Sequence, residues 1–544
     1  MFLGFFIALS ITALIIPLLA RVAGIIGLND SPGPRKVHST PVPRVGGIAM
    51  TVGMAIALLF GTDLAPELVA PAIAVLVLLV FGVLDDRCDL DYRVKFGGQL
   101  LAILLCLLLS DLRIDSITLD TRYALPAWSS TILTLVFLLG VTNAVNLSDG
   151  LDGLAGGMAL LCICGIALMA LSGGNLPVVG VALVMAGAII GFLRFNTHPA
   201  RVFMGDCGSQ ILGFAMGWLA ILTTQAETTA VSAALPLLLI GVPIVDTLSV
   251  IYLRLRDGRS PFSADRNHLH HRLLALGLRH AEAVSTVYLL QGVMFLLAYF
   301  MRFESDLLIG LSFLALSVGV LGSLSVAEKR GWRIRRERAD QPAHGFVQGL
   351  RGHLNRMGLQ QVAGGVLLLS AASYAGLVAT RVAEVQPDLA MLSLALAGML
   401  LIATRARANV AAWLDRAVAY TTVLIVVYLD QQQVMPSALS WLPPLSLPLI
   451  AAFAAVLRLM LASDQTFRAN SLDLLVLFIA IVVLQLPGPM QLPAGFAAGA
   501  VKAVLLLYVA EMSLAASGRR FVLRTLLGVI LVAFSLRALI GMQL

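Results

Sequence analysis

The chain has 544 residues, of which 59% are hydrophobic and only 12% are charged, and its mean hydropathy is +0.93. So small a polar fraction cannot cover the surface of a water-soluble globule, which excludes a soluble fold and indicates a protein solvated by lipid. The formal net charge of +7 is carried by the loops, so it bears on membrane orientation and anionic ligands rather than on nucleic acid.

Apolar stretches long enough to cross a hydrocarbon core of ~30 Å as helices recur along the whole chain. The first, FLGFFIALSITALIIPLLA, lacks a basic leader and a small-residue cleavage site, so we interpret it as a retained span. The sequence therefore predicts an all-α polytopic transmembrane protein. Its first 326 residues contain eleven predicted spans, at 2–20, 46–61, 67–84, 96–110, 129–146, 154–172, 177–194, 208–223, 234–253, 282–300 and 307–326.

The second part of the chain is separated from these spans by a basic, helix-breaking stretch at 327–360. We expect three parts: a core at 1–326, a cytoplasmic linker at 327–360 and a multi-span membrane domain at 361–544. The last part carries no motif that reveals its role. It contains about seven apolar segments, near 361–380, 388–404, 411–429, 445–462, 472–487, 495–514 and 521–540.

Charges in the loops predict the orientation, because Lys and Arg accumulate on the cytoplasmic side. The connections after spans one, three, seven and nine carry most of the basic residues of the core. The opposite connections offer only Arg113, Arg122 and Arg302. This asymmetry places the N-terminus outside and the odd-numbered connections in the cytoplasm.

Every polar-rich segment of the core falls on that cytoplasmic face. Loops that only joined helices would have no reason to collect carboxylates, imidazoles and guanidinium groups on one side, so the pooling predicts a shared site. The segments are DSPGPRKVHSTPVPRVGG (30–47), DDRCDLDYRVK (85–95), NAVNLSDGLDGL (143–154), FNTHPARVFMGDCGS (195–209) and SPFSADRNHLHHRL (260–273).

Asp85 and Asp86 end a predicted span, and adjacent carboxylates repel unless a cation or a proton lies between them. A solvated helix end explains such a pair in isolation. Here Asp206, Asp149 and Asp152 approach the same face, which favours a hard cation held by oxygen. Mg²⁺ fits, because it takes one or two carboxylates and completes its octahedron with water and substrate phosphates. No Cys or His spacing favours zinc.

Two motifs carry several glycines. GDCGS precedes a span, so Gly208 and Ser209 are candidates to open a helix whose free N–H groups face an anion, although both residues also simply cap helices. In NAVNLSDGLDGL, polar residues at three-residue intervals predict a row along one helical face, which suits a base and a ribose. Close helix packing and a water-lined edge are the alternatives. The row consists of Asn143, Asn146, Asp149 and Asp152.

The segment NHLHH gathers three imidazoles between two guanidinium groups, which predicts a surface that binds a pyrophosphate or a sugar phosphate. It contains His268, His270 and His271, flanked by Arg266 and Arg272.

Two further polar features have open interpretations. Arg35, Lys36 and His38 form a second basic cluster, for which positive-inside anchoring is an equally good explanation. Asp246 in PIVDTL is an intramembrane carboxylate, and such groups are functional candidates by default. A capping or paired structural role for Asp246 is equally open.

The five motifs, in this order, resemble those of the polyprenyl-phosphate N-acetylhexosamine-1-phosphate transferases, the glycosyltransferase family 4 membrane enzymes with WecA-like and MraY-like branches. The resemblance covers residues 1 to about 326 and agrees with the eleven spans. DDRCDLDYRVK and SPFSADRNHLHHRLL are similar to the WecA branch, which uses UDP-N-acetylglucosamine. The alternative is the MraY branch, the phospho-N-acetylmuramoyl-pentapeptide transferases of peptidoglycan synthesis. That branch typically has a lysine soon after its paired aspartates, where this chain has Arg87, Cys88 and Asp89.

The resemblance implies roles for the motif residues. Asp206 would be the main Mg²⁺ ligand, with Asp85 and Asp86 beside it in the catalytic centre, and Mn²⁺ would be a substitute metal. The nucleotide pocket would be lined by Asn143, Asn146, Asp149, Asp152 and Phe203, the last stacking on uracil. The diphosphate and sugar would be bound by His268, His270, His271 and Arg266. The lipid phosphate would be bound by Arg93 and Lys95.

The implied reaction is attack by undecaprenyl phosphate on the β-phosphorus of UDP-N-acetylglucosamine, or of a related UDP-N-acetylhexosamine, with release of UMP. The product would initiate a cell-envelope polysaccharide of the lipopolysaccharide O-antigen, common-antigen or teichoic-acid type. A phosphate monoester has its second pKa near ~6, so the nucleophile hardly needs a general base. The chief obstacle is repulsion between two anions, which Mg²⁺ and cationic side chains can screen.

The resemblance also implies a location, the bacterial inner membrane, with the active site on the cytoplasmic face; a homodimer is compatible with it. The C-terminal domain would dock partners of polysaccharide assembly or stabilise an oligomer. A transporter or scaffold for lipid-linked sugars is the rival of a different class. Its usual sign is helices broken at mid-membrane, whereas the acidic motifs here cluster at span ends.

Overall fold

The computed structural model describes residues 2–30, 41–61, 66–226, 229–260, 267–333, 359–381, 385–431 and 520–541, with scattered residues between 499 and 514. The chain divides into two compact units. The core unit is Met1–Arg338 with Asn470–Leu475, and the C-terminal unit is Ala339–Ala469 with Val476–Leu544.

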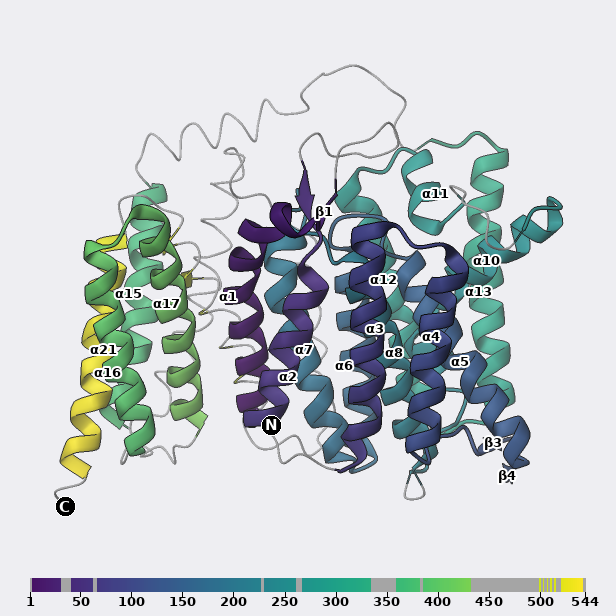
Figure 1. Ribbon diagram of the computed structural model, residues 1–544, viewed down its shortest axis with the longest axis horizontal. Coiled ribbons are helices and arrows are strands. Elements are labelled where there is room, and N and C mark those ends of the chain that lie inside the picture. Colours follow the sequence, from purple (N-terminus) through teal and green to yellow (C-terminus); the bar gives the residue numbers. More distant parts are fainter. Residues whose placement is uncertain are drawn as a thin grey trace. The chain divides into compact units, whose positions relative to one another are not determined.

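The core unit is a bundle of helices (Figure 1). A single 3-10 turn, η1 (Pro66–Leu68), precedes α3. In chain order the helices are α1 (Phe2–Ile26), α2 (Gly46–Gly61), α3 (Val69–Cys88), α4 (Tyr92–Leu109), α5 (Ala127–Leu147), α6 (Leu154–Ser172), α7 (Leu176–Asn196), α8 (Gly205–Gln225), α9 (Pro236–Leu239), α10 (Gly241–Arg256), α11 (Leu269–Ala275), α12 (His280–Phe300) and α13 (Asp306–Lys329).

The described residues include 11 helices long and apolar enough to cross a membrane, nine of them in the core unit. The prediction of an all-α polytopic membrane protein is therefore confirmed. Each of the eleven predicted core spans lies on helix, and α2 and α10 are the shorter ones at 16 residues each. Helix ends differ from the predicted bounds by a few residues, because apolarity marks the span and not its caps.

The ninth predicted span is interrupted, because Ile240 leaves the helical conformation between α9 and α10. Pro243 lies in the first turn of α10 and has no N–H to donate. The Gln291 side chain of α12 pairs with the interrupted backbone, since its Nε2 donates to the Leu239 carbonyl at 2.9 Å and its Oε1 accepts from the Val242 N–H at 3.1 Å. A backbone break inside lipid is tolerated only with such partners.

Two short antiparallel hairpins lie at opposite ends of the core bundle (Figure 1). Strand β1 (Asn29–Asp30) pairs with β2 (Val42–Pro43) at the end that also holds α11. Strand β3 (Ser116–Thr118) pairs with β4 (Arg122–Ala124) at the other end. The connection after α1 and the histidine motif therefore share one end of the bundle.

Helix α8 is the buried centre of the core unit. Of its most apolar 18-residue window, 89% is buried, compared with 11% for α13. Glycines let α8 approach its neighbours: a Cβ on Gly47 of α2 would lie 2.3 Å from the Gly208 backbone nitrogen, and one on Gly82 of α3 would lie 2.4 Å from the Cys207 Cα. Small residues permit this close packing in membranes.

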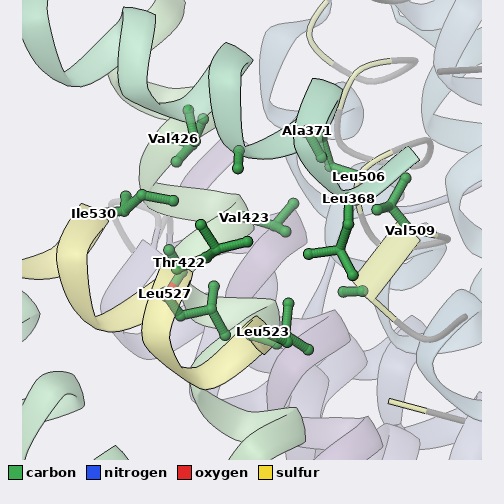
Figure 2. Close-up of a pocket in the computed structure, with 15 residues that line it drawn as sticks. Leu368, Ala371, Thr422, Val423, Val426, Leu506, Val509, Leu523, Leu527 and Ile530 are labelled. Carbon is green, nitrogen blue, oxygen red and sulfur yellow. The ribbon is translucent and has the colours of Figure 1, made fainter. Parts of the chain in front are cut away.

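In the C-terminal unit, four helices are described: α15 (Leu359–Arg381), α16 (Pro387–Arg405), α17 (Ala408–Gln431) and α21 (Arg520–Gly541). Arg524 binds the buried Asp415 carboxylate with two hydrogen bonds of 2.6 and 2.8 Å, and Lys502 binds Asp430 at 2.5 Å. Side chains of α15, α17 and α21, with Leu506, Val509 and Ala510, line a mainly apolar cavity (Figure 2). The predicted segments 445–462 and 472–487 lie outside the described residues.

Candidate active site

Two carboxylates from separate helices meet on the ammonium group of Lys95. Asp85 lies in the last turn of α3 and Asp206 in the first turn of α8. The Lys95 Nζ atom is 2.7 Å from Asp85 Oδ2 and 2.8 Å from Asp206 Oδ1. Lys95 reaches both because α4 begins shortly after α3, with Asp91 capping its first turn. The structure therefore places Lys95, predicted to bind the lipid phosphate, between two predicted metal ligands.

Asp86 is almost fully buried and caps α8 from outside that helix. Its Oδ1 accepts the Asp206 N–H at 2.9 Å and its Oδ2 accepts the Cys207 N–H at 3.2 Å. The unpaired N–H groups of a helix start attract negative charge, and the anion here is Asp86 itself. The prediction that Gly208 and Ser209 open this helix is wrong, because α8 begins at Gly205.

The carboxylates of Asp85, Asp86 and Asp206 are referred to below as the carboxylate centre. Gly205 lies directly against it with a φ of +74°, and a Cβ there would lie 2.4 Å from Asp86 Oδ2. Arg44 pairs with Asp30, and its guanidinium group is also 3.8 Å from Asp86 Oδ1. Arg44 thus supplies a second positive charge beside Lys95.

The end of α5 supplies amide groups to the same region. Asn146 Nδ2 donates to Asp206 Oδ1 at 2.5 Å and to Ser209 Oγ at 2.8 Å. Asn143 Nδ2 instead donates to Gln99 Oε1 at 2.7 Å and to the Leu139 carbonyl at 2.9 Å. Asn146 therefore orients the carboxylate centre, while Asn143 ties α5 to α4.

The predicted helical row does not continue past Asn146, because α5 ends at Leu147 and Asp149 and Asp152 lie in the following loop. Gly153, with a φ of +80°, supplies the left-handed conformation just before α6 begins. The Asp149 side chain is accessible to solvent, yet desolvation by the surrounding protein, together with the negative charges of Asp206 and Asp86, raises its pKa to about 7. Asp149 thus faces the carboxylate centre from the loop.

Asp152 joins two loops through a histidine. Its Oδ2 pairs with His198 Nδ1 at 2.8 Å and accepts the Ala200 N–H at 3.0 Å. Burial opposes ionisation, but these two hydrogen bonds hold the pKa of Asp152 below its ordinary value. Asp152 therefore fixes the segment that leads to Asp206 as well as its own loop.

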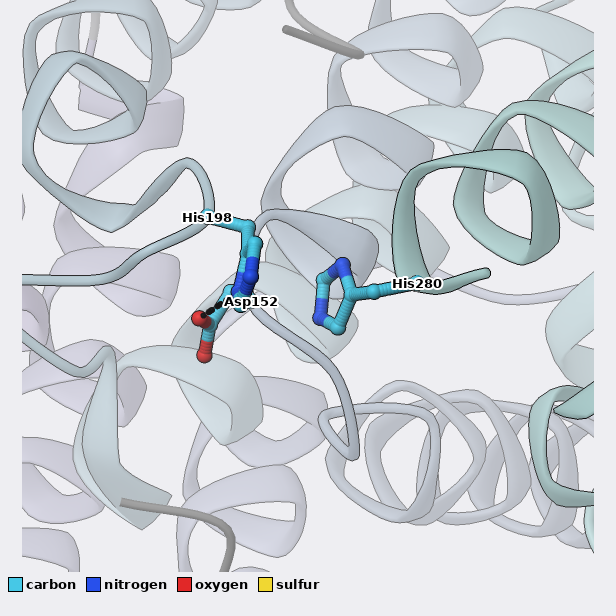
Figure 3. A group of neighbouring side chains, drawn as sticks. All are labelled: Asp152, His198 and His280. Carbon is cyan, nitrogen blue, oxygen red and sulfur yellow. Dashed lines mark hydrogen bonds and ion pairs between the residues drawn. The ribbon is translucent and has the colours of Figure 1, made fainter. Parts of the chain in front are cut away.

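His280, the first residue of α12, stacks on the His198 ring with centroids 4.1 Å apart and an interplanar angle of 21° (Figure 3). Among the described residues, ligand atoms of Asp152, His198 and His280 lie within 4.8 Å of one another. A histidine nitrogen binds a metal ion along its lone pair, which lies in the plane of the ring. The His198 and His280 rings are nearly parallel and 4.1 Å apart, so no single point close to both rings lies in both ring planes. The arrangement fits a hydrogen-bonded stack better than a metal site.

The histidine motif forms α11, a short helix beside the loop after α5. A Cβ on Gly150 would lie 2.3 Å from His270 Nε2, so this ring lies directly on the loop that carries Asp149. Burial, with the nearby His271, lowers the pKa of His270 to about 4, so its ring is neutral at pH 7. The structure places His268 and His270 with their rings 5.8 Å apart. Arg272 is occupied by Glu328 at 2.8 and 2.9 Å.

The remaining predicted site residues have different surroundings. Phe203 is held through its backbone, because its N–H donates to the Pro43 carbonyl at 2.8 Å and its carbonyl accepts from Gly46 at 3.0 Å. Arg93 is exposed and donates to the Tyr92 hydroxyl at 3.1 Å. Arg266 lies outside the described residues, as do Arg35, Lys36 and His38.

Sequence reasoning missed three groups of this region: Arg44, His198 and His280. Arg44 and His198 lie in motifs that were singled out, but nothing in their spacing indicates which carboxylate each one meets. His280 lies outside all five motifs and carries no signal of its own. Its contact with His198 exists only because α12 begins beside the loop that follows α7.

Comparisons with known proteins relate the chain to one family. Residues 68–224 match the model of glycosyl transferase family 4. A probable undecaprenyl-phosphate N-acetylglucosaminyl 1-phosphate transferase of Bacillus subtilis is 38% identical over 292 residues, which cover 81% of that protein and 53% of this chain.

Two other relatives have similar names. A decaprenyl-phosphate N-acetylglucosaminephosphotransferase of Mycolicibacterium smegmatis is 39% identical over 297 residues, or 72% of its length and 48% of this chain. An undecaprenyl-phosphate alpha-N-acetylglucosaminyl 1-phosphate transferase of Salmonella typhimurium is 31% identical over 295 residues, or 79% of its length and 52% of this chain. About half of the chain therefore lies outside each match.

Proposed function

The chain belongs to the polyprenyl-phosphate N-acetylglucosamine-1-phosphate transferases of glycosyl transferase family 4, and from this premise we propose its reaction in detail. It transfers N-acetylglucosamine 1-phosphate from UDP-N-acetylglucosamine to undecaprenyl phosphate and releases UMP. The observation that carries the proposal is the carboxylate centre, where residues from α3 and α8 meet with Lys95 between two of them.

The donor set at the carboxylate centre fits Mg²⁺. The contacts of Lys95 demonstrate that a positive charge is accommodated between Asp85 and Asp206, and both offer the hard oxygen ligands that Mg²⁺ prefers. Asp206 and Asp85 would hold the ion. Asp86 is less suited to binding it, because both of its oxygens already accept backbone N–H groups of α8. When bound, Mg²⁺ supplies neutralisation of phosphate charge.

Residues of the chain itself prepare this site for two phosphorylated molecules. Lys95 and Arg44 bring positive charge close to the carboxylate centre, where both would attract a substrate phosphate. Asn146 holds Asp206 in one orientation through a direct hydrogen bond. Fixed groups of this kind stabilise charge in phosphoryl transfer without reorganising during the reaction.

Substrate roles follow from position around this centre. Asp149 would form a hydrogen bond with the nucleoside, and the Phe203 ring would stack on uracil. His268 and His271 would bind the diphosphate. Asp152 acts indirectly, since His198 and Ala200 already engage its carboxylate.

Solvation by lipid explains why this transferase is embedded in a bilayer. Each buried methylene of a prenyl chain contributes ~0.8 kcal/mol, so membrane partitioning concentrates the lipid substrate and the site needs only to orient its phosphate. The loop charges support an orientation with the site in the cytoplasm and the N-terminus outside, as expected for a bacterial inner-membrane enzyme that meets soluble UDP-sugars. The product would serve envelope polysaccharide synthesis.

The test is transfer of label from radioactive UDP-N-acetylglucosamine into butanol-extractable lipid by the purified protein. Removing the main metal ligand with Asp206→Asn should lower the rate by roughly 10²–10³-fold, and chelation by EDTA should abolish transfer until Mg²⁺ is restored. The control is Asp257→Asn, at an exposed carboxylate that pairs with its neighbour Arg256, which should leave the rate unchanged. Full transfer by Asp206→Asn, or in EDTA, would contradict the assignment.

A further inference from the structure

Asp246 is a buried carboxylate that lies outside the carboxylate centre. It belongs to α10, and its side chain is 5% exposed. Its Oδ2 atom is 3.0 Å from Nδ1 of His268, and its Oδ1 atom accepts the N–H of Leu269 at 2.6 Å. A carboxylate in a membrane helix is costly unless it is paired, and here both oxygens engage the first residues of the histidine motif.

The contact fixes the chemical state of the His268 ring. A carboxylate accepts but cannot donate, so Nδ1 of His268 must carry the proton in this pair. The other ring nitrogen, Nε2, is then the one left to act on a further group. Because a phosphate oxygen also only accepts, Nε2 must be protonated to bind it, and the Asp246 charge balances the imidazolium ion that results.

The backbone of α11 holds this pair next to the candidate active site. His270 lies on Gly150, next to Asp149, whose pKa is raised in part by the negative charges of Asp206 and Asp86. The His268 and His270 rings are nearly parallel, with an interplanar angle of 14°. His268 is therefore two residues from His270, which touches the loop that carries Asp149 and Gly150. His270 is a poorer phosphate ligand, because burial keeps its ring neutral.

We infer that Asp246 is a positioning residue for the transferase reaction: it orients His268 as a charged hydrogen-bond donor to the diphosphate of the nucleotide sugar. This inference rests on the proposed function. Asp246 touches no substrate itself. Its second contact, with the Leu269 N–H, fixes the start of α11 and so the direction of the ring.

A double-mutant cycle tests the inference in the full-length protein. Asp246→Asn and His268→Gln should each lower kcat/KM for UDP-N-acetylglucosamine by about 10- to 100-fold, as expected for one lost hydrogen bond to a charged group. The double variant should be no slower than the slower single variant, because Asp246 acts only through His268. KM for undecaprenyl phosphate should stay unchanged in all three variants.

The matched control is Asp257→Asn, at an exposed aspartate that follows the last residue of the same helix, and it should behave as the parent. Multiplicative losses in the double variant, or a fully active Asp246→Asn, would overturn the inference. An inactive parent protein would instead overturn the proposed function, so the two failures are distinguishable.

A second variant separates a structural effect of Asp246→Asn from the loss of its contact with His268. Leu269→Pro removes the N–H that Asp246 Oδ1 accepts but leaves the His268 contact. Proline is tolerated at the first position of a helix, and His268 has φ −59° and ψ 147°, a conformation that suits a residue before proline. If Asp246 only caps α11, Leu269→Pro should lose as much kcat/KM as Asp246→Asn. The inference requires a distinctly smaller loss.

Discussion

Asp85 and Asp86 are neighbours in the chain, yet their side chains have different partners. Asp85 contacts Lys95, whereas Asp86 receives two backbone N–H groups of α8. The difference arises because both residues lie at the end of one helix and their side chains project about 100° apart. Asp86 therefore positions Asp206, and Asp85 faces Lys95, which lies between Asp85 of α3 and Asp206 of α8.

Gly205 is the residue that makes this arrangement possible, so Gly205→Ala should damage it. Alanine is strained at a φ of +74°, and its Cβ would lie 2.4 Å from Asp86 Oδ2. We expect a loss of about 2 kcal/mol in stability and of most transferase activity. Thermal unfolding in detergent and label transfer measure the two effects. Gly97→Ala is the control, because within the described part of the chain nothing beyond its own helix backbone lies within 4 Å of its Cβ position. Equal damage in both variants would contradict the account.

The pair between Asp152 and His198 predicts a pH-dependent effect of Asp152→Asn. Because the folded-state pKa of Asp152 is lowered, its charge stabilises the fold above the unfolded pKa of about 4, and this contribution is lost as the pH falls through the folded value. The variant should unfold about 1–2 °C below the parent at pH 7. The difference should shrink below about pH 4. A constant difference across this range would show that the charge is not responsible.

Among the helices, α2, α3 and α8 depend on glycines for their spacing. Gly47 faces Gly208, and Gly82 faces Cys207, at distances that leave no room for a Cβ atom. This close approach brings the last turn of α3 to the first turn of α8, where Asp86 and Asp206 meet. The absence of a Cβ atom at these glycines thus determines whether the carboxylate centre forms.

Gly82→Ala tests this dependence at the level of the helix pair. Its Cβ would lie 2.4 Å from the Cys207 Cα, a backbone atom that cannot rotate away. Overpacking of this kind costs about 1–3 kcal/mol, and the shift of α3 should also lower transfer. Gly140→Ala on α5 has no neighbour around its Cβ among the residues that the structure describes, and it should keep both the unfolding temperature and the activity of the parent. A Gly82→Ala protein with parental values would show that α3 and α8 adjust freely.

At the scale of the whole molecule, the described site residues all belong to the core unit, and the relatives match only about half of the chain. The C-terminal unit has its own buried ion pairs, Arg524 with Asp415 and Lys502 with Asp430. Pairs of this kind neutralise charges that would be costly in lipid. Each unit thus has the internal contacts expected of a separate membrane domain.

A protein truncated after residue 338 should therefore retain transferase activity. The truncation removes the C-terminal unit together with Asn470–Leu475, which are assigned to the core unit, and leaves every residue of the carboxylate centre in place. Label transfer by the purified truncated protein, with gel filtration to check that it is folded, measures the outcome. A folded but inactive truncation would show that the C-terminal unit is part of the catalytic unit.

Much of the candidate site could be predicted, but not the partners within it. The sequence predicts that Asp85, Asp86 and Asp206 lie close together, because they end or begin spans on one face. The row from Asn143 to Asp152 was wrong as a helical face, since the spacing alone does not reveal that Leu147 ends α5. The sequence predicts that Lys95 binds the lipid phosphate, because no pattern in the chain shows which carboxylates an ammonium group reaches.

The sequence by itself determined the membrane class, the spans and the face on which the polar motifs gather. These follow from hydropathy and loop charge, which act locally along the chain. Only the tertiary structure decided that Asp86 caps α8, that Asp152 engages His198 and that Asp246 holds His268. Each of these contacts joins residues that are distant in sequence, so it forms only when the helices pack in one particular way. That packing depends on glycines and on a backbone break at other positions in the chain.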